Sequence, residues 1–366
     1  MRKYLLLIFL FGLLASPRPA AQEFTEGLFT YRVLNDDQGN PTTNVAIVSS
    51  TVEDNADVVI PETTTFDGQE YTVRQLQALF PNGEGAARSL YLPASIYSIG
   101  TSWFSDEVRV NEEIVISEEN QLYKAVDNVV YSKDGTILFG ATRNIEKAII
   151  LNGVKRIADA AYYGCANITE VVLPETVESI GSQAFSDCPN LKTVILNKGL
   201  KSLDNCFSGS CSIKSVTIPS TVELLLNFPF CCSTLEEFKV EEYNSHYKSL
   251  SGCIYSSDYA KLCAVPCAKR SISYPVTLKV IGNKAFQKNI MDEIILPDRI
   301  TELEEFAFCD ASASRIEVPQ TVTKLSFGLF TGCRLLKNFN IPQSIKEIDL
   351  NVFWDCKSLE NITSVS

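Results

Sequence analysis

The chain has 366 residues, with 44 acidic against 32 basic side chains and a formal charge of −12. So acidic a surface repels phosphate backbones and anionic lipid headgroups, which argues against nucleic acids and membrane surfaces as partners. The length would suit two or three ordinary globular domains. For a repeat array, however, length does not predict the number of domains, because the array grows along one axis.

Residues 1–21 have the order of a secretory signal peptide: a basic start, a short apolar stretch and small residues at the end. The apolar stretch is shorter than the roughly 20 residues that span a bilayer. We therefore predict cleavage after Ala21 and an exported mature chain without a membrane-inserted segment. Removal of Arg2, Lys3 and Arg18 with the segment moves the formal charge from −12 to −15.

Residues 22–57 lack the repeated positions found further on. Their apolar side chains alternate with polar ones, as in Phe29-Thr30-Tyr31, which is typical of β-strands. We predict a small N-terminal β cap that covers the first coil of a repeat domain over 58–366.

One pattern recurs through the rest of the chain, as in Val171-Val172-Leu173-Pro174 followed by Phe185. Aliphatic residues stand three and six positions after the proline, a phenylalanine stands eleven after it, and adjacent copies are 22 or 23 residues apart. The phenylalanines of this column are Phe104, Phe185, Phe230, Phe286, Phe308, Phe330 and Phe353. Tyr162 and Phe207 hold the same place in two copies that lack the proline.

A period of 20–29 residues with one short strand per copy is typical of leucine-rich repeat solenoids. Strand alternation turns Val171 and Leu173 inward and Val172 outward, and proline ends the strand because it lacks an N–H. The predicted fold is a leucine-rich repeat solenoid, a right-handed β/α superhelix of short parallel strands with 3₁₀ or short helical turns that begin at Ala184-Phe185. We expect the phenylalanines to stack into one continuous aromatic column.

Two longer units, near 118–145 and 241–268, interrupt the repeats and match each other at an offset of 124 residues. Asn120 and Tyr123 in the first correspond to Asn244 and Tyr247 in the second. Each is predicted to be a β-hairpin insert, with Asp134-Gly135 as the turn in the first.

The repeat unit over 171–191 and both inserts resemble those of the BspA-like leucine-rich repeat surface proteins. A modest departure is that Asp127-Asn128 and Ser251-Gly252 stand where the family pattern has Asp-Gly. The resemblance implies an exported protein that binds host or neighbouring-cell proteins, with adhesion to extracellular matrix in some members. It brings no catalytic residues, no cofactor and no fixed binding residues.

Twelve cysteines in an exported chain invite a disulfide framework, but their positions favour packing. Five stand fourteen residues after the proline position: Cys165, Cys188, Cys211, Cys333 and Cys356. We interpret them as reduced, buried thiols, while an oxidised Cys333–Cys356 pair stays open. Cys231-Cys232, next to Phe230, is also interpreted as packing.

One cluster, formed by His246, Cys253, Cys263 and Cys267, has the composition of a zinc site. The matching positions of the first insert hold Leu122, Val129, Phe139 and Arg143. We therefore interpret the cysteines as replacements of buried hydrophobic residues, in preference to a metal site or a local disulfide.

No catalytic motif stands out. His246 is the only histidine, and its counterpart in the other insert is a leucine. Neither a glycine-rich phosphate loop nor a His-Glu-x-x-His motif occurs, so we predict no enzyme, no cofactor and no metal. Trp103 and Trp354, beside phenylalanines of the column, are interpreted as core-lining aromatics.

The expected binding surface is the row of outward side chains, one from each coil, on the strands that precede the proline position. This strand face comprises Val172, Ile195, Thr217, Lys239, Ile295, Glu317 and Asn340. Its mixed apolar and charged character suits a protein partner better than a small molecule. The alternatives are a structural component that associates weakly through the C-terminal coil near Ile362, left without a cap in our prediction, and a glycan-binding module.

Overall fold

The computed structural model describes residues 22–81, 83, 85–99, 108–209, 212–227 and 230–364. The predicted signal peptide, Trp103, Phe104 and Cys211 lie outside these residues. The described part consists of strands, turns and bends. None of it forms a helix, so it holds no helix that could cross a membrane.

The N-terminal strands form a mixed sheet in the order β1-β2-β3-β6-β5, and β8 also pairs with β6. Its strands are β1 (Glu23–Glu26), β2 (Phe29–Asn35), β3 (Pro41–Ser50), β5 (Thr63–Phe66), β6 (Gln69–Leu76) and β8 (Ser98–Ile99). A second, parallel sheet runs β4-β7-β9, with β4 (Asp57–Val59), β7 (Ala87–Leu92) and β9 (Val110–Ile116). The chain thus passes from antiparallel β1–β3 pairing into stacked parallel coils.

The first block of coils carries two parallel ladders. One ladder holds β14 (Glu170–Val172), β16 (Thr193–Ile195), β18 (Ser215–Ile218) and β20 (Glu237–Val240), which pair as β14-β16 and β18-β20. The other holds β12 (Ile137–Ala141), β13 (Arg156–Ile157), β15 (Ser179–Ile180), β17 (Ser202–Asp204) and β19 (Leu224–Leu226). Each coil thus contributes one short strand to each ladder.

The inserts are antiparallel hairpins that lead into the ladders. The first holds β10 (Tyr123–Val126) and β11 (Val129–Ser132), and the second holds β21 (Tyr247–Leu250), β22 (Cys253–Ser256) and β23 (Lys261–Ala264). The first hairpin turns at Asp127-Asn128, both with positive φ, and Asp134-Gly135 makes the next turn, into β12. Positive φ at both turn residues gives a tight turn whose twist suits the strands.

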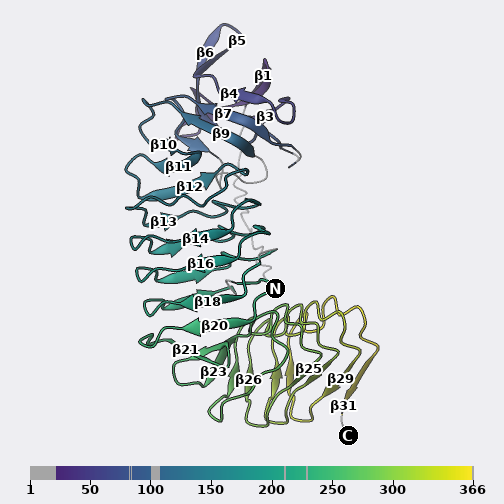
Figure 1. Ribbon diagram of the computed structural model, residues 1–366. Coiled ribbons are helices and arrows are strands. Elements are labelled where there is room, and N and C mark those ends of the chain that lie inside the picture. Colours follow the sequence, from purple (N-terminus) through teal and green to yellow (C-terminus); the bar gives the residue numbers. More distant parts are fainter. Residues whose placement is uncertain are drawn as a thin grey trace, which may run out of the picture.

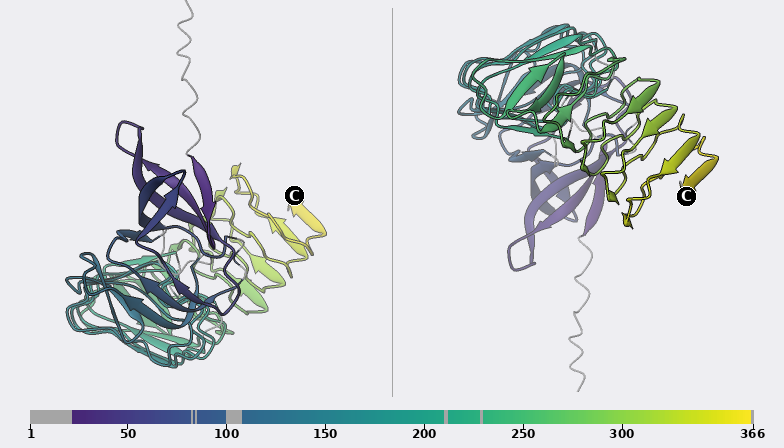
Figure 2. Two further views of the ribbon diagram at one scale, coloured as in Figure 1. Left: turned by 90° about the horizontal axis from the view of Figure 1, so that it is seen from above. Right: turned by 90° about the horizontal axis from the view of Figure 1, so that it is seen from below.

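The second block repeats both ladders. It holds β25 (Glu293–Ile295), β27 (Arg315–Glu317), β29 (Asn338–Ile341) and β31 (Asn361–Ser364) on one side, and β24 (Val280–Ile281), β26 (Glu302–Leu303), β28 (Lys324–Leu325) and β30 (Glu347–Ile348) on the other. The direction of stacking changes between the blocks, at β20–β26, as Figure 1 shows. Viewed from above and below, the second block extends sideways from the first (Figure 2).

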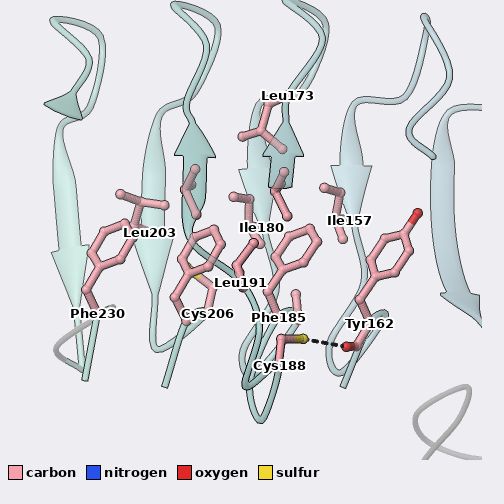
Figure 3. Packing of buried hydrophobic residues seen from close by; sticks show 14 of the residues in the cluster. Ile157, Tyr162, Leu173, Ile180, Phe185, Cys188, Leu191, Leu203, Cys206 and Phe230 are labelled. Carbon is pink, nitrogen blue, oxygen red and sulfur yellow. Dashed lines mark hydrogen bonds between the residues drawn. The ribbon is translucent and has the colours of Figure 1, made fainter. Parts of the chain in front are cut away.

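The side chains of the phenylalanine column stack as predicted within each block, and Figure 3 shows the stack of the first block. Successive ring centroids from Tyr162 through Phe185 and Phe207 to Phe230 lie 4.9–5.2 Å apart with interplanar angles of 8° or less. Neighbouring coils are spaced like paired strands, about 4.8 Å apart, so rings at one position of each coil meet face to face.

The column is nevertheless not continuous. A second stack runs from Phe286 through Phe308 and Phe330 to Phe353, with centroids 5.3–5.4 Å apart. Between the stacks, Phe230 meets Phe238 edge to face instead, at 6.0 Å and 64°. The expectation of one aromatic column is therefore wrong for the described residues, because the second insert separates the two stacks.

The predicted helical turns are also wrong. In the turn at the phenylalanine, Gln183, Phe185 and Asp187 donate their backbone N–H groups to the next coil, while Ala184 and Ser186 donate to carbonyls three residues earlier. Because every second N–H leaves the turn, consecutive bonds of the 3₁₀ type never accumulate into a helix.

Most described cysteines pack as predicted. Cys165, Cys188 and Cys333 are buried, Cys356 is half-buried, and all four are free thiols. The Sγ of Cys188 donates a hydrogen bond to the carbonyl of Tyr162 in the preceding coil at 3.2 Å (Figure 3). Cys232 corrects our interpretation, because it is disulfide-bonded.

Candidate binding face

The strand face is built from strands of three or four residues whose second side chain is buried. In β14 and β16, Val171 and Val194 point into the core, while Val172 and Ile195 are 49% and 50% exposed. The same pattern exposes Thr217, Lys239, Ile295, Glu317 and Asn340. Alternation along a strand thus presents every predicted residue outward.

Hydrogen-bonded register brings these residues together in pairs. Val172 lies opposite Ile195, Thr217 opposite Lys239, and Ile295 opposite Glu317. Asn340 lies opposite Thr363, whose Oγ1 is 2.5 Å from the Asn340 Oδ1. The two blocks stack in different directions, so the seven residues form two rows, one on the strands up to β20 and the other on the strands from β25 onward (Figure 1).

The two rows differ in chemistry. The first starts with the apolar pair Val172 and Ile195 and ends at Lys239, whose ammonium lies 3.5 Å from Glu237. In the second, Arg315 sits between Glu317 and Glu293, whose carboxylates raise the pKa of its guanidinium.

A shallow hollow covers the second row. It has a volume of about 520 Å³ and spreads over β25, β27 and β29, with Ile295, Arg315 and Asn340 in its lining. Because the Arg315 charge is shared between two carboxylates, the hollow is polar without carrying an unpaired cation.

Three further residues, not predicted from the sequence, belong to this face. Val59, Tyr91 and Val115 lie side by side on β4, β7 and β9, and each is between 37% and 64% exposed. The available signal was the proline position, because Val59 and Tyr91 stand two residues before Pro61 and Pro93, as Val172 does before Pro174.

Trp354 contradicts our interpretation of it as a core-lining aromatic, because it is 65% exposed. Its neighbour Phe353 takes the core position and stacks on Phe330. Consecutive residues of the turn face opposite ways, which leaves Trp354 on the outside.

The residues of the zinc-like cluster have different environments. Cys253 and Cys267 are fully buried, Cys263 is half-buried, and His246 is exposed with its Nδ1 3.1 Å from the hydroxyl of Ser245. Among the described residues, no group of three or more His, Cys, Asp or Glu side chains is placed to hold a metal ion.

Comparison with known proteins connects this geometry to a family. The profile described as "BspA type Leucine rich repeat region" matches residues 135–258 and 263–366, in six copies. No curated protein matches the chain.

Two solved structures are similar over nearly the whole chain. The pneumococcal vaccine antigen PcpA is 20% identical with a TM-score of 0.53, and the match covers 94% of this chain and 82% of that one. A leucine-rich cell surface protein from Faecalibacterium prausnitzii is 18% identical with a TM-score of 0.52, over 94% and 95% of the two chains. At such identities the likeness is one of fold.

Proposed function

Because the chain belongs to the BspA-type leucine-rich repeat family, we propose that it is an exported surface scaffold that binds a protein partner through its strand face. The partner we propose is a host or neighbouring-cell protein, which makes the role adhesin-like. The signal-peptide order of residues 1–21 supports export. The description of the similar Faecalibacterium prausnitzii chain as a cell surface protein supports the location.

One observation carries the proposal: half-exposed apolar side chains lie in register on a ladder of paired strands. Val172 and Ile195 form one such group, and Val59, Tyr91 and Val115 form another. Exposed apolar rows rimmed by polar residues are typical of protein interaction sites. These two groups lie outside the hollow over β25, β27 and β29, and exposed apolar area without a concave pocket favours a protein partner over a small molecule.

We also propose that residues 22–57 act as the cap of the solenoid. Val45 and Ile47 of β3 are fully buried, and β3 pairs in parallel with β6. This pairing would protect the edge of the first coil from unwanted strand addition.

The test is a binding screen with purified residues 22–366 against immobilised fibronectin, laminin and collagen and against a glycan array. For a partner that is found, the double variant Val172→Glu/Ile195→Glu should bind at least about tenfold more weakly, since centrally placed apolar contacts carry most of the binding energy. Val276→Glu is the matched control, because Val276 is 85% exposed and lies off the strand face.

Three results would overturn parts of this proposal. Unchanged binding by the double variant, and by a triple replacement of Ile195, Lys239 and Glu317, would show that another face is used. Binding to glycans alone would exclude the protein partner. Concentration-dependent self-association in light scattering, with no binding to the panel, would favour a structural component.

A further inference from the structure

A cavity lies where the two blocks meet, on the ladder opposite the strand face. It has a volume of about 410 Å³ and lies between β19, at the edge of the first block, and the hairpin strands β21–β23. Its apolar lining comes from Leu225, Leu226, Phe230, Phe238, Tyr247 and Ile254. Small-molecule sites usually have volumes of about 300–1,000 Å³ and mainly apolar walls.

The internal duplication shows what kind of group this place accepts. In the first insert, Phe139 on β12 packs its ring edge to face against Tyr123, with centroids 5.4 Å apart at 82°. The matching pair in the second insert, 124 residues later, is Cys263 and Tyr247, and both line the cavity. The second insert therefore keeps the tyrosine and has a cysteine at the position where the first insert has the phenylalanine.

Larger side chains at other positions do not close the space. Phe238 and Ile254 stand where the first insert has Ile114 and Val130, and the cavity persists beside them. An apolar cavity of this kind favours an apolar guest, because its walls gain dispersion contacts that water cannot replace.

The polar groups of the lining are already engaged by the protein. The Tyr247 hydroxyl accepts a hydrogen bond from the Leu225 N–H at 3.1 Å and donates to the Glu223 carbonyl at 3.3 Å. The Ser256 hydroxyl donates to Asp258 at 2.6 Å and accepts from the Lys261 N–H at 2.9 Å. Neither hydroxyl needs a ligand as partner.

The charge at the rim is also neutralised. Lys261 Nζ lies 2.7 Å from Glu304 Oε1, and Glu304 Oε2 accepts the Asn283 N–H at 2.8 Å. An ionic ligand would have to compete with this pair, whereas an uncharged ligand would leave it intact.

We propose that this cavity, the junction pocket, binds a small uncharged aromatic molecule of one or two rings. One ring occupies the place that Phe139 fills in the first insert and packs edge to face against Tyr247. The site lies on the opposite ladder from the strand face, so it does not depend on the proposed protein binding.

The experiment uses residues 22–366 with 1-naphthol and its saturated analogue decahydro-1-naphthol, measured by saturation-transfer NMR and titration calorimetry. Naphthol should bind at least about threefold more tightly than the saturated analogue, because edge-to-face packing adds to apolar burial. Cys263→Phe should weaken naphthol binding at least about tenfold by filling the pocket, while Cys263→Ala should bind within about threefold of the unchanged chain.

Each alternative result decides against a defined part of the proposal. Equal binding of the two probes would remove the aromatic preference, and absence of naphthol binding would remove the ligand class. Unchanged binding by a folded Cys263→Phe variant would place the probe elsewhere. If circular dichroism shows that Cys263→Phe does not fold, Cys263→Leu fills part of the same space and is judged by the same criterion.

Discussion

Single aromatic side chains fix the spacing of the coils. Phe185 is fully buried and lies between Tyr162 and Phe207, both 5.2 Å away and nearly parallel to it. Each ring thus contacts the coil before and the coil after its own. Removing one ring would take contacts from three coils at once.

The first prediction concerns this ring. Phe185→Ala should lower the free energy of unfolding by about 3–5 kcal/mol, since it deletes a buried aromatic and leaves a cavity. The measurement is the urea midpoint followed by circular dichroism. Trp354→Ala is the control and should cost less than about 0.5 kcal/mol, because Trp354 is 65% exposed. Equal losses in the two variants would contradict the stacking account.

Buried thiols make a second contribution to the stability of the fold, and this one depends on pH. Burial raises the pKa of Cys188 and of Cys253 to about 12. A raised pKa means that the folded state holds the proton more tightly than the unfolded chain, whose thiols have a pKa of about 8.5. The stabilisation is fully present below that pH and is lost as the pH rises toward 12.

We therefore expect the Tm to fall as the pH is raised from 8 through about 9 and 10.5, as unfolded thiolates form while folded thiols remain protonated. Differential scanning calorimetry at these values measures the decline. The double variant Cys188→Ala/Cys253→Ala should decline less steeply. If the Tm of the unchanged chain and that of the double variant fall equally with pH, groups other than these two thiols cause the decline.

At the scale of the element, a buried asparagine anchors each hairpin insert. The Asn244 side-chain amide donates to the carbonyls of Pro219 and Val222 at 2.8 and 3.0 Å, and its Oδ1 accepts the N–H groups of His246 and Tyr247. Asn120 makes the same set of bonds in the first insert. The asparagine thereby ties the start of the hairpin to the preceding coil.

The third prediction follows from these bonds. Asn244→Ala should cost about 2–4 kcal/mol, because it leaves buried backbone groups without partners. Asn190→Ala is the matched control, because Asn190 is exposed and its side-chain amide donates a hydrogen bond to the Ala166 carbonyl at 2.9 Å. Hydrogen exchange at Tyr247 and the strands after it should accelerate in the Asn244 variant alone. Equal protection in both variants would show that the hairpin is held otherwise.

The elements also show how far the sequence could lead. The phenylalanine spacing was sufficient to predict that rings stack, and the proline position was sufficient to predict that Val172 points outward. The 124-residue offset was sufficient to identify Asn120 and Asn244 as equivalent positions of the two inserts. The turn at Phe185 could not be inferred, because its hydrogen bonds go to another coil and leave no local pattern. The exchange of Phe139 for Cys263 is visible in the sequence, but no repeat position encodes the change of stacking direction beside which the junction pocket lies.

At the scale of the whole molecule, the apolar core of the described residues falls into three clusters, one in the N-terminal sheets, from Phe24 to Val130, and two in the blocks of coils. One core cluster runs from Val129 to Cys267 and includes Phe185, while another runs from Cys253 to Val352 and includes Phe308. Repeat proteins derive stability from each unit and its nearest neighbours, so a loss in one cluster reaches the other only weakly. We expect the blocks to open as separate units.

The fourth prediction tests this division. Phe308→Ala should accelerate amide exchange across residues 278–352 and leave residues 154–216 protected, and Phe185→Ala should do the reverse. Native-state hydrogen exchange with mass spectrometry measures both. The pair of variants is its own control, because each removes the same side chain from a different block. Exchange that rises in both blocks for either variant would show one cooperative unit.

The way every coil bonds to its neighbour has a consequence for how such a molecule lengthens. Equivalent N–H groups donate to equivalent carbonyls one coil on, as for Tyr162 to Ala184 and Phe286 to Ala307. A whole module gained or lost between two neighbours would restore the same contacts, whereas a change of a few residues would shift every later side chain out of step. Tandem duplication of whole modules therefore disturbs the fold least. A duplicated module can then lose a packing side chain, such as the one that Phe139 supplies in the first insert, and gain a pocket in its place.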